Sequence, residues 1–109
     1  MQLEEKAVRL KIYVGESDHF EGQPAYKAVV VFLRAQGIWG ATVHRGILGF
    51  GKRSVVHSTS ALRLSGDLPM IIEAVDTERK LLPLVPRLSE MVKGGLITLD
   101  EVRVLRHLD

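Results

Sequence analysis

Apolar residues recur along this chain with two different periods, and the order in which the periods alternate limits the fold more than any other feature. Near the start, Val8, Leu10, Ile12 and Val14 alternate with charged or aromatic residues. A period of two is typical of a strand that buries one face. We expect this strand to end at Gly15, with one of its sides facing a core.

Helical spacing follows in residues 25–36. This segment is rich in valine, yet its apolar side chains recur as they do on one face of a helix. Pro24 suits a first helical turn and Gly37 suits a C-terminal cap. The pattern therefore predicts a helix here and not a strand.

A second helix is predicted from a longer apolar stripe that contains two prolines. The stripe and its candidate caps are Leu81, Leu84, Val85, Leu88, Met91 and Val92, with Asp76 or Thr77 at the start and Gly94 at the end. Pro83 and Pro86 lie inside it. Because a proline removes a hydrogen bond and crowds the preceding turn, we expect this helix to bend there or to begin nearer Leu82.

The remaining strand candidates complete two strand–helix–strand units. They are residues 41–48, 69–75 and 102–105, with a shorter extended piece at 96–99 and a small hairpin between 54–57 and 61–64. Right-handed crossovers in two successive units give a four-stranded antiparallel sheet with both helices on one face. The sequence therefore predicts a ferredoxin-like βαββαβ sandwich of the α+β class.

Composition narrows the class of protein further. With 109 residues, of which 46% are hydrophobic, the chain 1–109 is expected to form a single domain. The absence of cysteine excludes disulfides and thiolate sites and fits a reducing compartment. Neither a signal peptide nor an apolar run of about 20 residues is visible, so we expect a cytoplasmic protein with no membrane insertion. Fifteen basic and 13 acidic residues are scattered without blocks, which argues against nucleic-acid binding.

Residues that could perform catalysis are sparse. The four histidines occur in separate predicted elements, so no metal-ligand spacing is visible and no metal site is predicted. No nucleophile elbow or framed carboxylate pair is present. Glu73 is the one unexpected carboxylate, and strand alternation is expected to turn it to the open face of the sheet. We therefore predict no enzymatic activity.

The most suggestive local feature is a glycine cluster at residues 46–53. Gly49, Phe50 and Gly51 are followed by Lys52 and Arg53. Glycines there would let backbone N–H groups converge on a phosphate, with the cations adding charge. A bulge or tight turn with solvated cations also explains the cluster, and the spacing alone slightly favours this explanation.

A related pattern stands after the second helix. Lys93 with two following glycines would offer a similar anion site, and a plain helix C-cap with a terminal lysine accounts for it as well.

These segments carry a resemblance to known families. Ile38-Trp39-Gly40-Ala41-Thr42-Val43 and Gly49-Phe50-Gly51-Lys52 resemble the part of PII signal proteins that runs from strand two into their mobile loop. A second resemblance, to the PII relatives called domain of unknown function 190, rests on Gly15-Glu16-Ser17-Asp18, Gly40-Ala41-Thr42-Val43, Arg45-Gly46-Ile47, Gly49-Phe50-Gly51, Leu64-Ser65 and Asp67-Leu68-Pro69. This likeness covers nearly the whole chain.

The resemblance implies a homotrimeric signalling protein with an adenine nucleotide (ATP, ADP or AMP) in its inter-subunit clefts. Arg106 matches the first of two arginines that close the PII nucleotide site, whereas Leu108 stands where the second would be. The ligand-binding residues implied are Gly49, Phe50, Gly51, Lys52, Lys93 and Arg106. Genes of this family often neighbour fluoride exporters, so a membrane transporter or channel is the implied partner.

Two functions remain open from the sequence. The first is a trimeric regulatory module that contacts its partner through residues 52–62. The alternative is an enzyme that acts on a phosphorylated small molecule in the same cleft, although no acid, base or nucleophile can be named for it.

Overall fold

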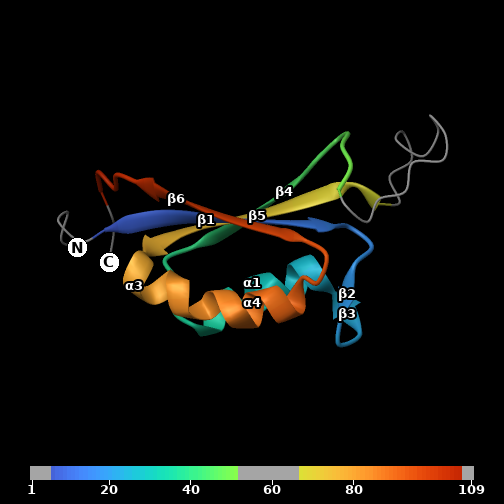
Figure 1. The fold of residues 1–109 in the computed structure, drawn as a ribbon, viewed down its shortest axis with the longest axis horizontal. Coiled ribbons are helices and arrows are strands. Elements are labelled where there is room, and N and C mark those ends of the chain that lie inside the picture. Colours follow the sequence, from blue (N-terminus) through green and yellow to red (C-terminus); the bar gives the residue numbers. More distant parts are fainter. Residues whose placement is uncertain (1–5, 52–66, 107–109) are drawn as a thin grey trace.

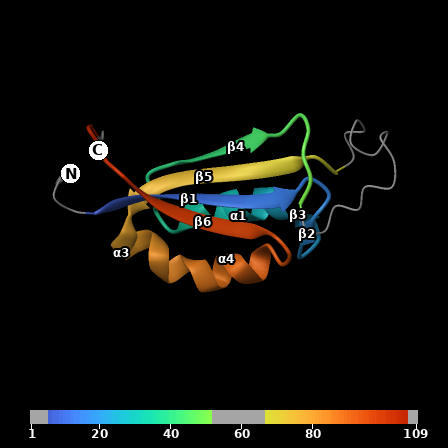
Figure 2. The same ribbon diagram turned by 45° about the horizontal axis from the view of Figure 1, so that its top comes forward.

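The computed structural model describes residues 6–51 and 67–106, in which helices cover one face of a four-stranded sheet (Figure 1). The strands are β1 (Ala7–Gly15), β4 (Ala41–Arg45), β5 (Pro69–Thr77) and β6 (Leu96–Val102). All neighbouring strands are antiparallel, in the order β4-β5-β1-β6, which Figure 2 shows across the sheet. This arrangement confirms the predicted ferredoxin-like α+β fold.

The first helix forms where helical spacing predicted it. α1 spans Ala25–Ala35, follows Pro24, and ends before Gly37, whose φ of 74° suits glycine. It buries Ala28, Val29 and Leu33 against the sheet.

The second helix is interrupted at its prolines, as expected. α3 (Glu78–Leu81) passes into a short 3₁₀ helix, η2 (Leu82–Leu84), and then into α4 (Val85–Met91). The Thr77 hydroxyl caps the start by accepting the Lys80 N–H at 3.3 Å. None of the helices within residues 6–51 and 67–106 has the length and apolar composition needed to cross a bilayer.

The core lies between the sheet and the helices. Alternate residues of the central strands point into it, and Leu10, Ile12 and Ile72 are fully buried. On the other face, Lys11 pairs in register with Glu73, and no described segment covers these side chains. Glu73 therefore lies on the open face, as the strand alternation predicted.

Strand boundaries differ from the sequence prediction most in β6 and β4, and β5 extends two residues further than predicted, to Thr77. β6 runs over Leu96–Val102, whereas the main strand was predicted at 102–105. Its pairing with β1 ends where Val102 meets Ala7, the first residue of β1, and residues 103–106 pair with no strand among the described residues. β4 ends at Arg45 and not at residue 48.

A small hairpin that the sequence did not predict follows β1. β2 (His19–Phe20) and β3 (Gln23–Pro24) pair around Glu21 and Gly22, both of which have positive φ. Two such residues fit a type I′ hairpin turn. The hairpin predicted between 54–57 and 61–64 lies outside the described residues.

Candidate ligand-binding site

The turn after β1, formed by Gly15-Glu16-Ser17-Asp18, is the framework of the candidate site and is called the β1 turn below. The Asp18 carboxylate accepts the Gly15 N–H at 3.0 Å, and the Asp18 N–H donates to the Gly15 carbonyl at 3.1 Å. The Asp18 carbonyl accepts the N–H of Ala25 at 2.8 Å, where α1 begins. These bonds join the end of β1 to the first helix.

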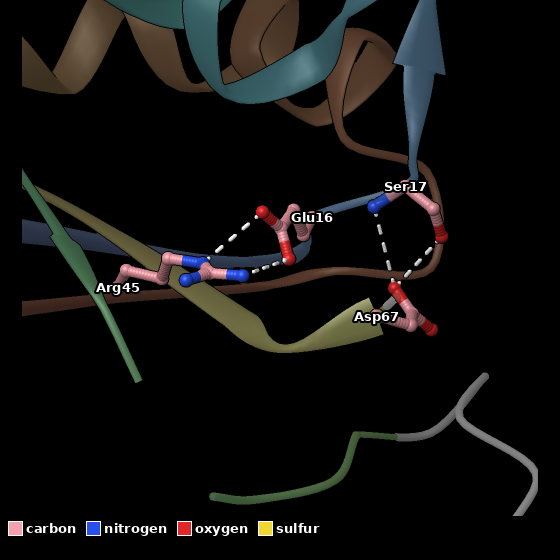
Figure 3. A network of polar contacts seen from close by, with 4 residues as sticks. All are labelled: Glu16, Ser17, Arg45 and Asp67. Carbon is pink, nitrogen blue, oxygen red and sulfur yellow. Dashed lines mark hydrogen bonds and ion pairs between the residues drawn. The ribbon is translucent and has the colours of Figure 1, made fainter. Parts of the chain in front are cut away.

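The β1 turn also holds the chain on both sides of residues 46–66 (Figure 3). Arg45 donates two hydrogen bonds of 3.1 Å to the Glu16 carboxylate, the two-pronged geometry that suits arginine. The Ser17 hydroxyl and N–H both donate to Asp67 Oδ1, at 2.8 and 3.3 Å. The chain immediately before and after this segment is therefore fixed to one turn.

A pocket of about 370 Å³ opens beside the β1 turn. Its apolar and aromatic lining consists of Tyr13, Val14, Phe50, Pro69 and Leu96. The rest of the lining consists of Asp18, Asp67 and the glycines Gly15, Gly51, Gly94 and Gly95. The two glycine-containing segments that the sequence singled out, near residues 51 and 94, therefore meet at one pocket.

The glycines of residues 46–51 serve partly in packing. A Cβ at Gly46 would lie 2.7 Å from the Pro69 ring and one at Gly49 would lie 3.1 Å from it, so both glycines let the chain cross Pro69 closely. The Gly46 N–H already donates to the Pro69 carbonyl at 2.7 Å. At Gly51, by contrast, a Cβ would have no neighbour within 4 Å. Of the predicted cluster, Phe50 and Gly51 line the pocket and Gly49 does not.

Neither Lys93 nor Arg106, the two predicted cations that lie within the described residues, lines this pocket. Lys93 precedes the pocket glycines but lines a neighbouring hollow of about 330 Å³, which also includes Asp18. Arg106 follows β6, whose last residue pairs with Ala7, whereas the pocket lies at the Gly15 end of β1. At about 3.3 Å per strand residue, these ends lie about 25 Å apart. Lys52 is outside the described residues.

An ion pair lies on the open face of the sheet, away from the pocket. Arg9 donates to Asp100 through Nε and Nη2, at 3.3 and 2.6 Å. This hydrogen bonding lowers the pKa of the Asp100 carboxyl and raises the pKa of the Arg9 guanidinium.

Sequence reasoning missed the two carboxylates of the pocket. Asp18 and Asp67 were noted as parts of short family motifs and were not assigned to a site. The available signal was the position of Asp18 in the turn that follows a strand, but its proximity to Asp67 depends on tertiary structure. Among the described residues, no cluster of three or more histidine or acidic side chains could hold a metal ion.

Solved structures of CPII, a nitrogen regulatory PII-like protein from Thiomonas intermedia K12, share this fold. The structure bound to ADP, AMP and bicarbonate matches with a TM-score of 0.62 and 19% identity, over 93% of this chain and 90% of that one. The structure bound to ADP, AMP and acetate matches with a TM-score of 0.59 and 21% identity, over 94% and 91%. The fold is therefore PII-like.

Relatives with higher sequence identity carry a family name. A UPF0166 protein of Methanocaldococcus jannaschii is 44% identical over 102 residues, covering 93% of this chain and 94% of the relative. A UPF0166 protein of Aquifex aeolicus is 37% identical over 99 residues, covering 88% and 90%. Residues 7–104 match DUF190, described as "Uncharacterized ACR, COG1993". The resemblance seen in the sequence motifs is thus confirmed, and the chain belongs to the DUF190 family.

Proposed function

We propose that this protein is a cytoplasmic PII-like regulator that forms one domain and binds an adenine nucleotide (ATP, ADP or AMP) at the pocket beside the β1 turn. The observation that carries this proposal is the meeting of Gly51 with Gly94 and Gly95 at one pocket, although more than 40 residues separate them in sequence. Its volume of about 370 Å³ falls within the range of about 300–1,000 Å³ that is usual for small-molecule sites.

The fold relatives support an adenine nucleotide as the ligand. CPII, whose fold this chain shares, has been crystallised with ADP and AMP. The pocket offers Phe50, Tyr13 and Leu96 as apolar and aromatic surface, which is the surface that a purine base requires.

A homotrimer completes the proposal. The face of the sheet that bears Lys11 and Glu73 has no cover among the described segments, and a second subunit would supply one. Arg106 lies at the far end of the sheet from the pocket of its own chain. Neighbouring subunits could bring the Arg106 of one chain to the mouth of the pocket of another, which is how we expect this residue to bind phosphate.

The proposed partner is another protein, with a membrane transporter or channel as the candidate. Ile47, Leu48 and Phe50 are 92%, 62% and 77% exposed, and they follow the anchored end of β4. Exposed apolar side chains next to a ligand pocket give a partner a surface whose shape depends on the ligand.

Calorimetry with ATP, ADP and AMP tests nucleotide binding, and light scattering tests the trimer. Gly51→Leu should weaken binding at least tenfold because the new side chain has open space to enter and occupies the pocket. Gly40→Leu is the matched control, since a Cβ there also meets nothing within 4 Å but Gly40 does not line the pocket.

A second pair of variants tests the contribution from the neighbouring subunit. Arg106→Ala should weaken nucleotide binding, whereas Arg34→Ala, which removes the same charge from the exposed surface of α1, should not. A wild-type protein that binds none of the three nucleotides at millimolar concentration would overturn the nucleotide proposal. A mass equal to one chain at micromolar concentration would overturn the trimer.

A further inference from the structure

The pocket beside the β1 turn contains acidic groups and no described cation. Asp18 and Asp67 contribute to its lining, and no lysine, arginine or histidine of residues 6–51 and 67–106 does so. Nucleotide phosphates are anionic, and like charges held close together disfavour one another. A phosphate group is therefore a poor occupant of the pocket itself, in contrast to the phosphate site that the glycine cluster suggested.

Backbone donors at the pocket are also used within the chain. The Gly95 N–H donates to the Val92 carbonyl at 2.7 Å, and the Gly15 N–H donates to Asp18 Oδ2 at 3.0 Å. A phosphate nest needs several N–H groups that point to one place and have no other acceptor. Gly15 and Gly95 do not supply such groups.

Each carboxylate, however, keeps one oxygen for a ligand. Asp18 accepts a hydrogen bond through Oδ2, and Asp67 accepts from Ser17 through Oδ1. Within the described ranges, no hydrogen bond reaches Asp18 Oδ1 or Asp67 Oδ2, and Figure 3 shows the latter turned away from Ser17. A Cβ at Gly15 would lie 2.6 Å from Asp67 Oδ1 and 3.3 Å from Asp18 Oδ2, so the two carboxyl groups are neighbours on either side of Gly15.

From this arrangement we infer that the pocket holds the nucleoside end of the ligand, with Asp18 and Asp67 accepting hydrogen bonds from the neighbouring 2′- and 3′-hydroxyls of a ribose. The inference rests on the proposed nucleotide binding and adds which end of the nucleotide enters. A ribose presents two adjacent hydroxyl donors, and two neighbouring carboxylates supply two strong acceptors for them. Phe50 and Leu96 contact the base, and the phosphates stay at the mouth, near Lys93.

The first test uses the wild-type protein alone. In calorimetry with a chelator present, 2′-deoxy-ADP and 3′-deoxy-ADP should each bind about tenfold more weakly than ADP, because each lacks one hydroxyl donor to a carboxylate. Adenosine should retain measurable binding, and inorganic pyrophosphate should show none at the same concentration. Equal binding of the deoxy analogues, or pyrophosphate binding as tight as that of adenosine, would overturn the inference.

The second test asks whether replacing the pocket carboxylates weakens or tightens ADP binding. Asp18→Asn and Asp67→Asn should each weaken ADP binding about tenfold, because a neutral amide accepts a hydroxyl less strongly than a carboxylate does. If phosphates occupied the pocket, the same substitutions would remove a repulsion and tighten binding. Glu78→Gln removes a carboxylate at the start of α3 and should leave affinity unchanged.

The outcomes separate this inference from the proposed function. Unchanged or tighter ADP binding by both pocket variants would overturn the inference while leaving nucleotide binding in place. Failure of the wild type to bind any adenine nucleotide would overturn both.

Discussion

Gly95 is the position where adding a single methyl group should produce a clear steric clash with the backbone. It joins the end of the second helix to β6 and lines the pocket. A Cβ added there would lie 2.5 Å from the Tyr13 carbonyl oxygen and 3.0 Å from the Val92 carbonyl oxygen. Both atoms belong to the backbone, so neither can rotate away as a side chain would.

The expected loss of stability follows from what holds the Tyr13 carbonyl. Tyr13 lies in β1 and pairs with Ile71 on one side and Leu96 on the other, so moving it disturbs two strand pairings. Overpacking in a rigid setting costs about 1–3 kcal/mol. We expect Gly95→Ala to lower the free energy of unfolding by about 2 kcal/mol and the melting temperature by roughly 10 °C.

Denaturant and thermal unfolding at one fixed protein concentration measure this effect, because any oligomer makes the melting temperature depend on concentration. Gly40→Ala is the control: a Cβ there meets nothing within 4 Å and the φ of Gly40 is not positive. Gly40→Ala should be neutral or stabilise by less than about 1 kcal/mol. A Gly95→Ala protein within about 0.5 kcal/mol of this control would refute the steric argument.

Two further predictions concern buried and exposed carboxylates. Asp76 is fully buried and accepts hydrogen bonds from Lys80 Nζ at 2.9 Å and from the Trp39 N–H at 3.1 Å. Asp76→Ala should therefore lower the free energy of unfolding, measured in urea, by about 3 kcal/mol. A loss below about 1 kcal/mol would contradict this prediction. The hydrogen bond from Arg9 lowers the pKa of the Asp100 carboxyl. The stabilisation that this ion pair gives the folded protein is therefore present above the ordinary aspartate pKa of 3.8 and is lost as the pH falls through the lowered pKa. Wild type and Asp100→Asn should therefore differ in their unfolding midpoints by a constant amount between about pH 5 and 8. The difference should begin to shrink only as the pH falls below about 4, and a difference that grows on acidification would contradict the assignment.

The fold was predictable because its core pattern is local. Alternation in β1 and helical spacing in α1 each follow from one face meeting the core, and both elements lie within one or two residues of their predicted bounds. Pro83 and Pro86 likewise act on the turn that contains them, and the interruption of the second helix was foreseen for that reason.

The errors arose where distant residues decide the outcome. The position of β6 depends on where β1 begins, at Ala7, and this partner cannot be identified from the apolar pattern of residues 96–105. The carboxylates of the pocket were missed for the same reason. Asp18 and Asp67 are far apart in sequence and become neighbours through tertiary contacts such as the hydrogen bond from the Ser17 hydroxyl to Asp67. Glycine spacing suggested an anion site from one segment alone, and it could not anticipate that carboxylates from elsewhere share the pocket.

The β1 turn links ligand binding to the rest of the chain in the proposed function. Asp67 accepts from Ser17 through one oxygen and offers the other to the pocket, so a ligand that bonds Asp67 acts on a residue that also anchors the chain next to residues 46–66. The opposite side of that segment is held by Arg45 and Glu16, on the same turn. Under the proposed binding mode, the residue that contacts the ligand and the residue that joins the chain at position 67 to the β1 turn are the same carboxylate. In the proposed function, this shared role of Asp67 is the physical basis on which pocket occupancy would reach a protein partner.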